Sequence, residues 1–166
     1  MKCRTVLMGL VICLLFVSSA YSASLAFKSI PLSSDILAVG NEAGRVNYYT
    51  SPFNLPNRVP NTDVLLVLMA YEVNDEYNFF TLNVPDSERR VINDAHYRDA
   101  RGSRYYAGKL LPSGGSWATQ IVPLRQSLLR TQGNILGIHT RTDSGSASGN
   151  TDDIKVTRMY LIYYVT

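Results

Sequence analysis

Hydrophobic residues occur along this chain in short runs, and the run at residues 64–71 is the longest after the N-terminal segment. Its eight apolar residues leave no side for water, and turn residues stand at Pro60-Asn61 before it and at Asn74-Asp75 after it. β-branched and aromatic residues are also frequent, which favours a strand over a helix. Such a strand must be covered on both faces or lie at the centre of a sheet. We therefore expect residues 64–71 to be the central strand of a β-sandwich.

The rest of the chain alternates short apolar stretches with turn residues. Residues 23–50 fit two or three short strands, and prolines at every fourth position make residues 51–61 an extended connection. After the turn at 74–77, residues 78–84 are expected to return as the second strand of an antiparallel hairpin. The remaining candidate strands are residues 105–110, 117–122, 135–141 and 153–166.

A single short helical turn is expected among these strands. Residues 123–130 begin with proline, which is favoured at the first helical position, and Leu124, Leu128 and Leu129 fall on one face of a helix. About eight short strands with one helical turn near residues 123–130 predict an all-β fold. The expected architecture is a jelly-roll-like antiparallel β-sandwich that forms one domain from residue 23 to residue 166.

The segment after the expected hairpin has a different character. Residues 85–104 are mostly charged and polar, with Val91 and Ile92 as an isolated apolar pair. A loop of this length inside a compact domain is uncommon and is usually functional or mobile. We therefore interpret residues 86–104 as a long polar insert loop and as the first place to look for a site.

The first 22 residues have the three parts of a secretory signal peptide. Lys2 and Arg4 precede an apolar run at residues 6–17, and small and polar residues follow it up to Ser22. The alternative, a membrane anchor, is disfavoured because the run is too short to span a bilayer. We expect cleavage after Ser22, with alternative sites after residues 20 and 23. The mature protein is then secreted, periplasmic or extracellular, without membrane insertion.

Removal of this segment changes the composition of the chain. Cys3 and Cys13 leave with it, so the remaining 144 residues contain no cysteine and the fold contains no disulfide. A chain of about this length can bury about 68 to 70% of its unfolded surface, which is enough for a stable core. The net charge falls from +3 to +1, because two of the 16 basic residues are lost while all 13 acidic residues stay. No bulk attraction to nucleic acid is expected.

Three short motifs follow one another between residues 63 and 165. The first is the apolar strand with its aspartate turn, followed by N-x-x-x-L-N at residues 78–83. The second is W-x-x-x-x-V-P-L-x-x-x-L-L at residues 117–129, and the third is G-N-I-L-G-I-H at residues 133–139, with D-D-I-K-V at residues 152–156. In this order they resemble the galactose-binding-like jelly roll of many carbohydrate-binding modules. The polar insert and the N-terminal third depart from that pattern.

The resemblance implies a non-catalytic, secreted carbohydrate-binding module whose partner is a glycan or another cell-envelope component. Sugar rings have an apolar face and a rim of hydroxyls, so their sites combine aromatic side chains with hydrogen-bonding groups such as arginine. In the alternative interpretation, Trp117 and one of two adjacent tyrosines fill the core. The candidate ligand-binding residues are Tyr97, Arg101, Arg104, Tyr105, Tyr106 and Trp117.

A structural calcium, which related modules often carry, is the metal to consider, and no other cofactor is expected to be required. Aspartates at the junction of a loop and a strand also serve as turn caps, which is the alternative role. His96 and His139 lack the spacing of a zinc site, and His139 is expected to be a hydrogen-bonded histidine within a strand. The candidate calcium ligands are Asp152 and Asp153, with Asp143 and with Asp75 or Glu72.

Two other functional classes stay open at this point. A small glycan-active enzyme would need paired carboxylates, for which Glu72 with Asp75 or Glu76 with Glu88 are candidates, but no flanking pattern supports them, and no G-x-S-x-G motif occurs. A protein-interaction or self-assembly module would bind a protein partner through the polar insert and by strand addition to the apolar final strand.

Overall fold

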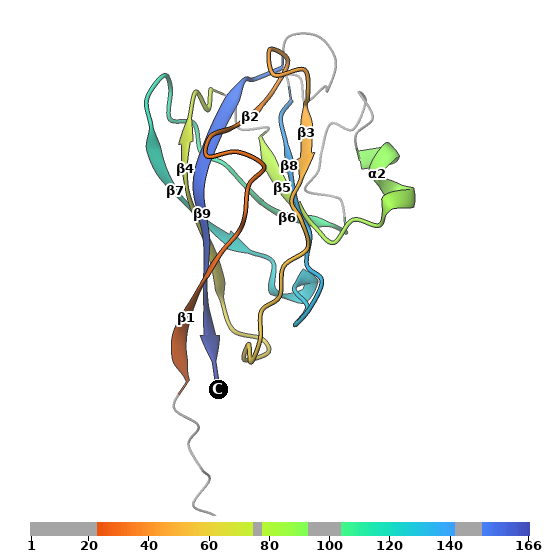
Figure 1. Ribbon diagram of the computed structural model, residues 1–166, viewed down its shortest axis with the longest axis vertical. Helices are drawn as coiled ribbons and strands as arrows, with labels where there is room; N and C mark the ends of the chain where they lie inside the picture. Colours follow the sequence, from red (N-terminus) through yellow and green to blue (C-terminus); the bar gives the residue numbers. More distant parts are fainter. Residues whose placement is uncertain (1–22, 75–77, 93–103, 142–150) are drawn as a thin grey trace, which may run out of the picture.

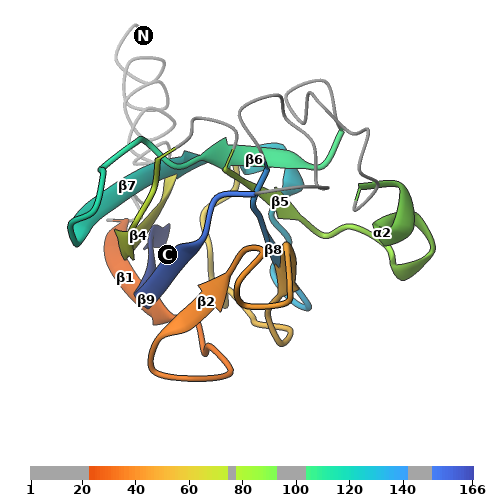
Figure 2. The same ribbon diagram turned by 90° about the horizontal axis from the view of Figure 1, so that it is seen from above.

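The computed structural model describes residues 23–74, 78–92, 104–141 and 151–166, which form two antiparallel sheets packed face to face (Figures 1 and 2). The first sheet has the order β1 (Ser24–Ser29), β9 (Ile154–Val165), β4 (Val64–Tyr71) and β7 (Ala118–Leu124), and β2 (Leu37–Val39) also pairs with β9. The second sheet has the order β3 (Asn47–Tyr49), β8 (Leu136–His139), β5 (Phe79–Leu82) and β6 (Tyr106–Lys109). The expected signal peptide lies outside the described residues.

The path of the chain between the sheets identifies the fold. From β2 onward the chain changes sheet at every connection except the one between β5 and β6. Both sheets are therefore wound together, which gives the strand orders β2-β9-β4-β7 and β3-β8-β5-β6 of an eight-stranded jelly roll. The prediction of an all-β, jelly-roll-like antiparallel sandwich is confirmed. No helix in the described ranges is long and apolar enough to cross a membrane.

β4 lies inside its sheet, with β9 hydrogen-bonded on one side and β7 on the other. Val64, Leu66, Leu68 and Ala70 point into the sandwich and are at most 1% exposed, whereas the alternate residues are half-buried. Each buried leucine contributes about 1.5 to 3 kcal/mol of hydrophobic stabilisation. The prediction of a central strand is confirmed, and only one of its two faces is fully buried.

The expected hairpin between β4 and β5 does not form. β4 belongs to the first sheet and β5 to the second, where its neighbours are β6 and β8. Both strands bring apolar residues to the same core, with Phe80 and Leu82 facing it from β5. Two strands can face one core from opposite sides only if they lie in opposite sheets, so this arrangement lets both strands bury their apolar residues together.

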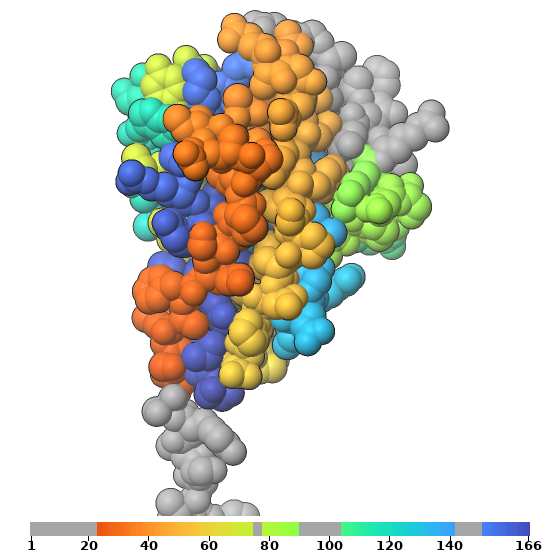
Figure 3. Space-filling view, in the orientation of Figure 1, coloured from red at the N-terminus to blue at the C-terminus, as the bar shows by residue number. Residues whose placement is uncertain are grey.

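β9 contains a bulge that keeps its apolar residues directed inward. Thr157 pairs with Met69 and Tyr160 pairs with Val67, so β9 has one residue more than β4 over this interval. Arg158 has a φ of 52°, a left-handed conformation that is common where a strand bulges. β1 and the segment after it lie beside β9 along the molecule (Figure 3). Because β9 has paired strands on both edges, strand addition to it would require one of them to leave.

Two helical details differ from the sequence-based expectation. The polar insert begins with a helix, α2 (Asp86–Ile92), instead of a loop throughout. Pro85 precedes this helix, and Asp86 and Glu88 lie in its first turn, where acidic side chains stabilise the helix dipole. The expected turn near 123–130 is a 3-10 helix at Gln126–Leu128, whereas Pro123 lies within the edge strand β7, a position that proline tolerates.

Candidate functional site

Trp117 lies on the surface at the start of β7 and is 39% exposed, so the alternative in which it fills the core is wrong. Its ring packs against Tyr71 at the end of β4, with ring centroids 5.5 Å apart and planes inclined by 40°. The outer face of Trp117 stays open to solvent while its inner side is supported. An exposed and supported indole can stack on a flat, weakly polar ligand.

Tyr71 is in turn contacted by Lys155, which is paired with Glu72. The ammonium group of Lys155 lies 4.9 Å from the centroid of the Tyr71 ring and 2.8 Å from Oε2 of Glu72. The hydrogen bond to Glu72 raises the pKa of Lys155, so the cation is retained at neutral pH. Glu72 has a φ of 59°, which ends β4 and turns the chain away from the sheet. The row Trp117, Tyr71, Lys155 and Glu72 thus fixes the orientation of the indole.

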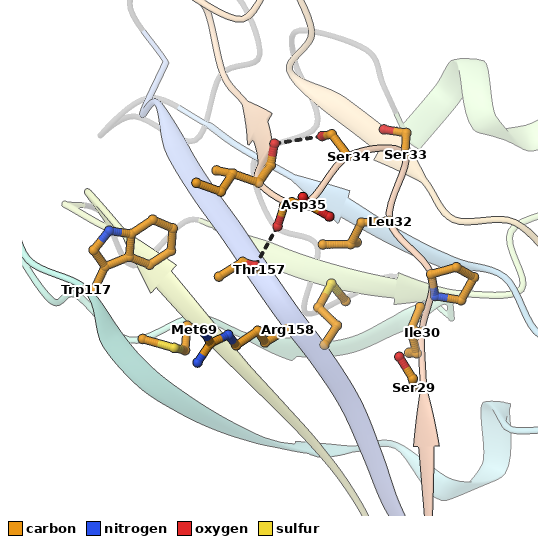
Figure 4. A pocket seen from close by; sticks show the side chains of 13 residues that line it. Ser29, Ile30, Leu32, Ser33, Ser34, Asp35, Met69, Trp117, Thr157 and Arg158 are labelled. Atoms are coloured by element: carbon orange, nitrogen blue, oxygen red, sulfur yellow. Dashed lines mark hydrogen bonds between the residues drawn. The ribbon is translucent and has the colours of Figure 1, made fainter.

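The segment 29–36 faces Trp117 across β9 and forms the other wall of a groove of about 900 Å³ (Figure 4). We call this the Trp117 groove. Its floor is formed by Met69 of β4 and by Thr157, Arg158 and Met159 of β9. The remaining lining residues of the wall are Ser29, Ile30, Pro31, Leu32, Ser33, Ser34, Asp35 and Ile36.

Hydrogen bonds hold this wall in place against both sheets. The Ile30 N–H donates to the Met159 carbonyl at 2.9 Å, and the Ser33 N–H donates to the Tyr48 hydroxyl at 3.1 Å. The Thr157 hydroxyl donates to the Asp35 carbonyl at 2.5 Å, a contact drawn in Figure 4. The wall is therefore anchored near its beginning, middle and end, and a ligand would not have to order it on binding.

The groove combines apolar and hydrogen-bonding groups. Asp35 supplies a carboxylate and Arg158 a guanidinium, and both side chains are exposed, while Ser33 supplies an exposed hydroxyl. The bulge in β9 is what turns Arg158 outward between the inward-facing Val156 and Met159. An aromatic face opposite a polar wall suits a ligand with an apolar face and a hydroxyl rim.

The other predicted ligand-binding residues do not lie with Trp117. Arg104 Nη2 is 2.5 Å from Glu88 Oε1, and the Tyr105 hydroxyl donates to the same oxygen at 2.9 Å. These contacts join the residues before β6 to α2. The hydrogen bond to Glu88 also raises the pKa of Arg104. Both ribbon views place α2 on the opposite side of the sandwich from β7 (Figures 1 and 2). Tyr97 and Arg101 lie outside the described residues.

Tyr106 lies on the outer side of the second sheet within an aromatic and polar cluster. Its ring is 6.3 Å from Phe79, which stacks on His139 at 4.7 Å. His139 is fully buried and contacts Thr81 Oγ1 at 2.9 Å and Asn47 Oδ1 at 2.7 Å. Burial holds the pKa of His139 well below its ordinary value, with a smaller contribution from Arg141. The prediction of a hydrogen-bonded histidine within a strand is confirmed.

Asp152 and Asp153 cap loops that meet at the start of β9. Asp152 Oδ2 accepts hydrogen bonds from the Asn74 N–H at 2.9 Å and from Asn78 Nδ2 at 2.5 Å. Asp153 Oδ1 accepts a hydrogen bond from the Glu42 N–H at 2.8 Å. Within the described ranges, no three His, Cys, Asp or Glu side chains are grouped closely enough to hold a metal. Asp75 and Asp143 lie outside those ranges, and the calcium site stays a prediction.

Sequence reasoning identified Trp117 but missed the wall opposite it. The one available signal was in the final strand. Inward-facing apolar residues of a regular strand are two positions apart, but Val156 and Met159 are three positions apart, as expected for a bulge at Arg158. Nothing in the pattern of residues 29–36 indicates that they lie over β9. Comparisons with models of known protein families and with curated proteins gave no match.

Proposed function

We propose that this protein is a non-catalytic carbohydrate-binding module that acts after export and binds a glycan in the Trp117 groove. The observation that supports this function best is an exposed, rigidly supported indole that faces a wall of hydroxyl and charged groups. The C–H face of a sugar ring stacks on the indole, and its hydroxyls accept or donate hydrogen bonds at the rim.

The size and charge of the groove agree with this function. A volume of about 900 Å³ is at the upper end of the range for ligand pockets, about 300 to 1,000 Å³, and accommodates a short oligosaccharide better than a single sugar. Arg158 can donate paired hydrogen bonds to adjacent hydroxyls or to the carboxylate of an acidic sugar. Asp35 accepts hydrogen bonds from hydroxyls on the opposite side.

The same groove supports binding without turnover. Glycoside hydrolysis generally uses two carboxylates at a defined separation. Asp35 is the one acidic residue among the described residues that line the Trp117 groove. We therefore propose that the glycan is bound and released unchanged.

A glycan array supplemented with acidic and amino-sugar polymers tests the proposal. Trp117→Ala should weaken binding to the recognised glycan by about tenfold or more, because it removes a central aromatic contact. Leu111→Ala is the matched control, since Leu111 is a similarly exposed apolar residue, 58% exposed, that does not line the groove. Equal melting temperatures for both variants would exclude a folding effect.

A substitution at Arg104, a candidate ligand-binding residue that lies beside α2, completes the test. Arg104→Ala removes the contact with Glu88 near α2 and should leave glycan binding unchanged. Loss of binding in Arg104→Ala with retention in Trp117→Ala would move the site to α2. A blank array together with a saturable protein partner would replace the carbohydrate function with a protein-interaction function.

A further inference from the structure

The outer face of the first sheet is apolar over most of its width. The strand register places Leu65 beside Ile162 on β9 and beside Pro123 on β7, and it places Val67 beside Tyr160 and Ile121. On the other side of β9, Phe27 of β1 is opposite Ile162. We call this surface the apolar face; its residues are Leu25, Phe27, Leu65, Val67, Ile121, Pro123, Tyr160, Ile162 and Tyr164.

These side chains are open to solvent to an unusual degree. Phe27 is 70% exposed, Ile121 59%, Leu25 55%, Tyr160 42% and Tyr164 40%. A single exposed apolar residue needs no explanation, but a contiguous group on four adjacent strands is rare on a protein that acts alone. The face thus has the composition of a surface that is covered in the working state.

The apolar face carries no formal charge. On β9, Arg158 borders the face next to Tyr160 and lines the Trp117 groove, and Lys155 lies farther from the face and pairs with Glu72. In a two-fold interface each patch meets a copy of itself, so a charged patch would face its own sign. An uncharged patch avoids this repulsion and is therefore suited to self-association.

The dimensions of the face agree with a weak, reversible dimer. Four strands about 4.8 Å apart and five residues of about 3.3 Å each, the interval from Tyr160 to Tyr164 on β9, give a footprint of roughly 300 Å². This is below the roughly 800 Å² that each partner buries in a standard interface, so the dimer should dissociate readily on dilution. We infer that two copies of this chain pack through their apolar faces, sheet on sheet, about a two-fold axis.

The apolar face and the Trp117 groove are neighbours on the same sheet. Val67 and Tyr160 of the face lie beside Met69 and Arg158, which belong to the floor of the groove. Aligned sheets stack about 10 Å apart, the spacing already present inside each sandwich. The dimer would carry two grooves, one beside each end of the interface.

Analytical ultracentrifugation tests the inference. The sample is the chain without its first 22 residues, at protein concentrations of roughly 1 to 100 µM. The wild type should sediment as a dimer that dissociates on dilution. Ile121→Glu should weaken association by at least about tenfold, because it places a charge in the buried surface beside Val67. Leu111→Glu, at a matched exposure outside the face, should leave the dimer unchanged.

Two further measurements guard against misfolding and against a different interface. Phe27→Ser removes the most exposed side chain of the apolar face and should also yield a folded monomer with a cooperative melting transition. Because the processed chain has no cysteine, Ile121→Cys and Leu111→Cys each carry one thiol for maleimide labelling. The dimer should slow labelling at position 121 but not at position 111. A wild type that stays monomeric throughout, or Ile121→Glu that associates like the wild type, would overturn the inference.

Discussion

The ring of Tyr71 contacts both the indole of Trp117 and the ammonium group of Lys155, with its centroid 5.5 Å from the Trp117 centroid and 4.9 Å from Lys155 Nζ. Tyr71 therefore links a residue at the start of β7 with a residue near the start of β9. The consequence is that the orientation of the indole depends on a side chain that does not itself line the groove. This relationship can be tested separately from glycan binding.

Removal of the Tyr71 ring should loosen Trp117 without unfolding the protein. Because Trp117 is the sole tryptophan, its fluorescence reports on this site alone. Tyr71→Ala should shift the emission to longer wavelength as the indole gains contact with water, and it should weaken glycan binding several-fold. Tyr71→Phe keeps the ring and should behave like the wild type. Identical emission spectra for Tyr71→Ala and the wild type would contradict the supporting role.

Leu66→Ala should destabilise the protein strongly. Leu66 is fully buried in β4, so truncation removes buried apolar surface and leaves a cavity, at a cost of about 2 to 5 kcal/mol. Leu65→Ala on the same strand is the matched control, because Leu65 is half-buried on the outer face. Its cost should be clearly smaller. Urea unfolding measures both values, and equal losses would show that β4 is not oriented as described.

Chelation separates the two roles considered for Asp152. If Asp152 is a cap, Asp152→Ala should lower the free energy of unfolding by about 1 to 3 kcal/mol, because the Asn74 N–H and the Asn78 side-chain amide lose their acceptor. The melting temperature should then be the same in EDTA and in millimolar calcium. Asp86→Ala, which removes an ion pair between the exposed Asp86 and the half-buried Arg89, should cost less than about 1 kcal/mol. A higher melting temperature in calcium would instead support a metal site.

Acidification should destabilise the fold through His139. Burial keeps the folded pKa well below 6.5, so folded His139 stays neutral while the unfolded chain takes up a proton as the pH falls through about 6.5. The unfolded state then binds more protons, and the free energy of unfolding falls by at most about 1.4 kcal/mol per pH unit. Unfolding at pH 7.5 and 5.5 measures the slope. His139→Gln should flatten this slope, and an unchanged slope in that variant would contradict the assignment.

Local sequence patterns predicted the positions of the strands better than they predicted which strands pair with one another. The uninterrupted apolar run gave the limits of β4, because burial of one face and partial cover of the other require apolar residues at every position. The same information could not show that β5 lies in the opposite sheet, since sheet membership depends on contacts distant in sequence. Helix α2 was missed because the charged composition of the insert outweighed Pro85 and the acidic first turn.

The candidate site was predicted only in part for a similar reason. Trp117 stood out as a single aromatic residue after a glycine turn, and its exposure agrees with a surface role. Arg104 and Tyr105 had suitable chemistry, but their contacts with Glu88 depend on the position of α2. The wall of the groove comes from residues 29–36, which reach β9 only after the whole sandwich has formed.

The central position of β9 also determines when the first sheet can be completed. β9 is the last strand of the sandwich to be synthesised, yet it pairs with β1, β2 and β4, which are made much earlier. Until it emerges, β1 and β2 have no partner in their sheet, and β4 lacks a neighbour on one edge. Pairings between such distant segments form slowly. A growing chain of this topology therefore stays incompletely folded until its last strand is available.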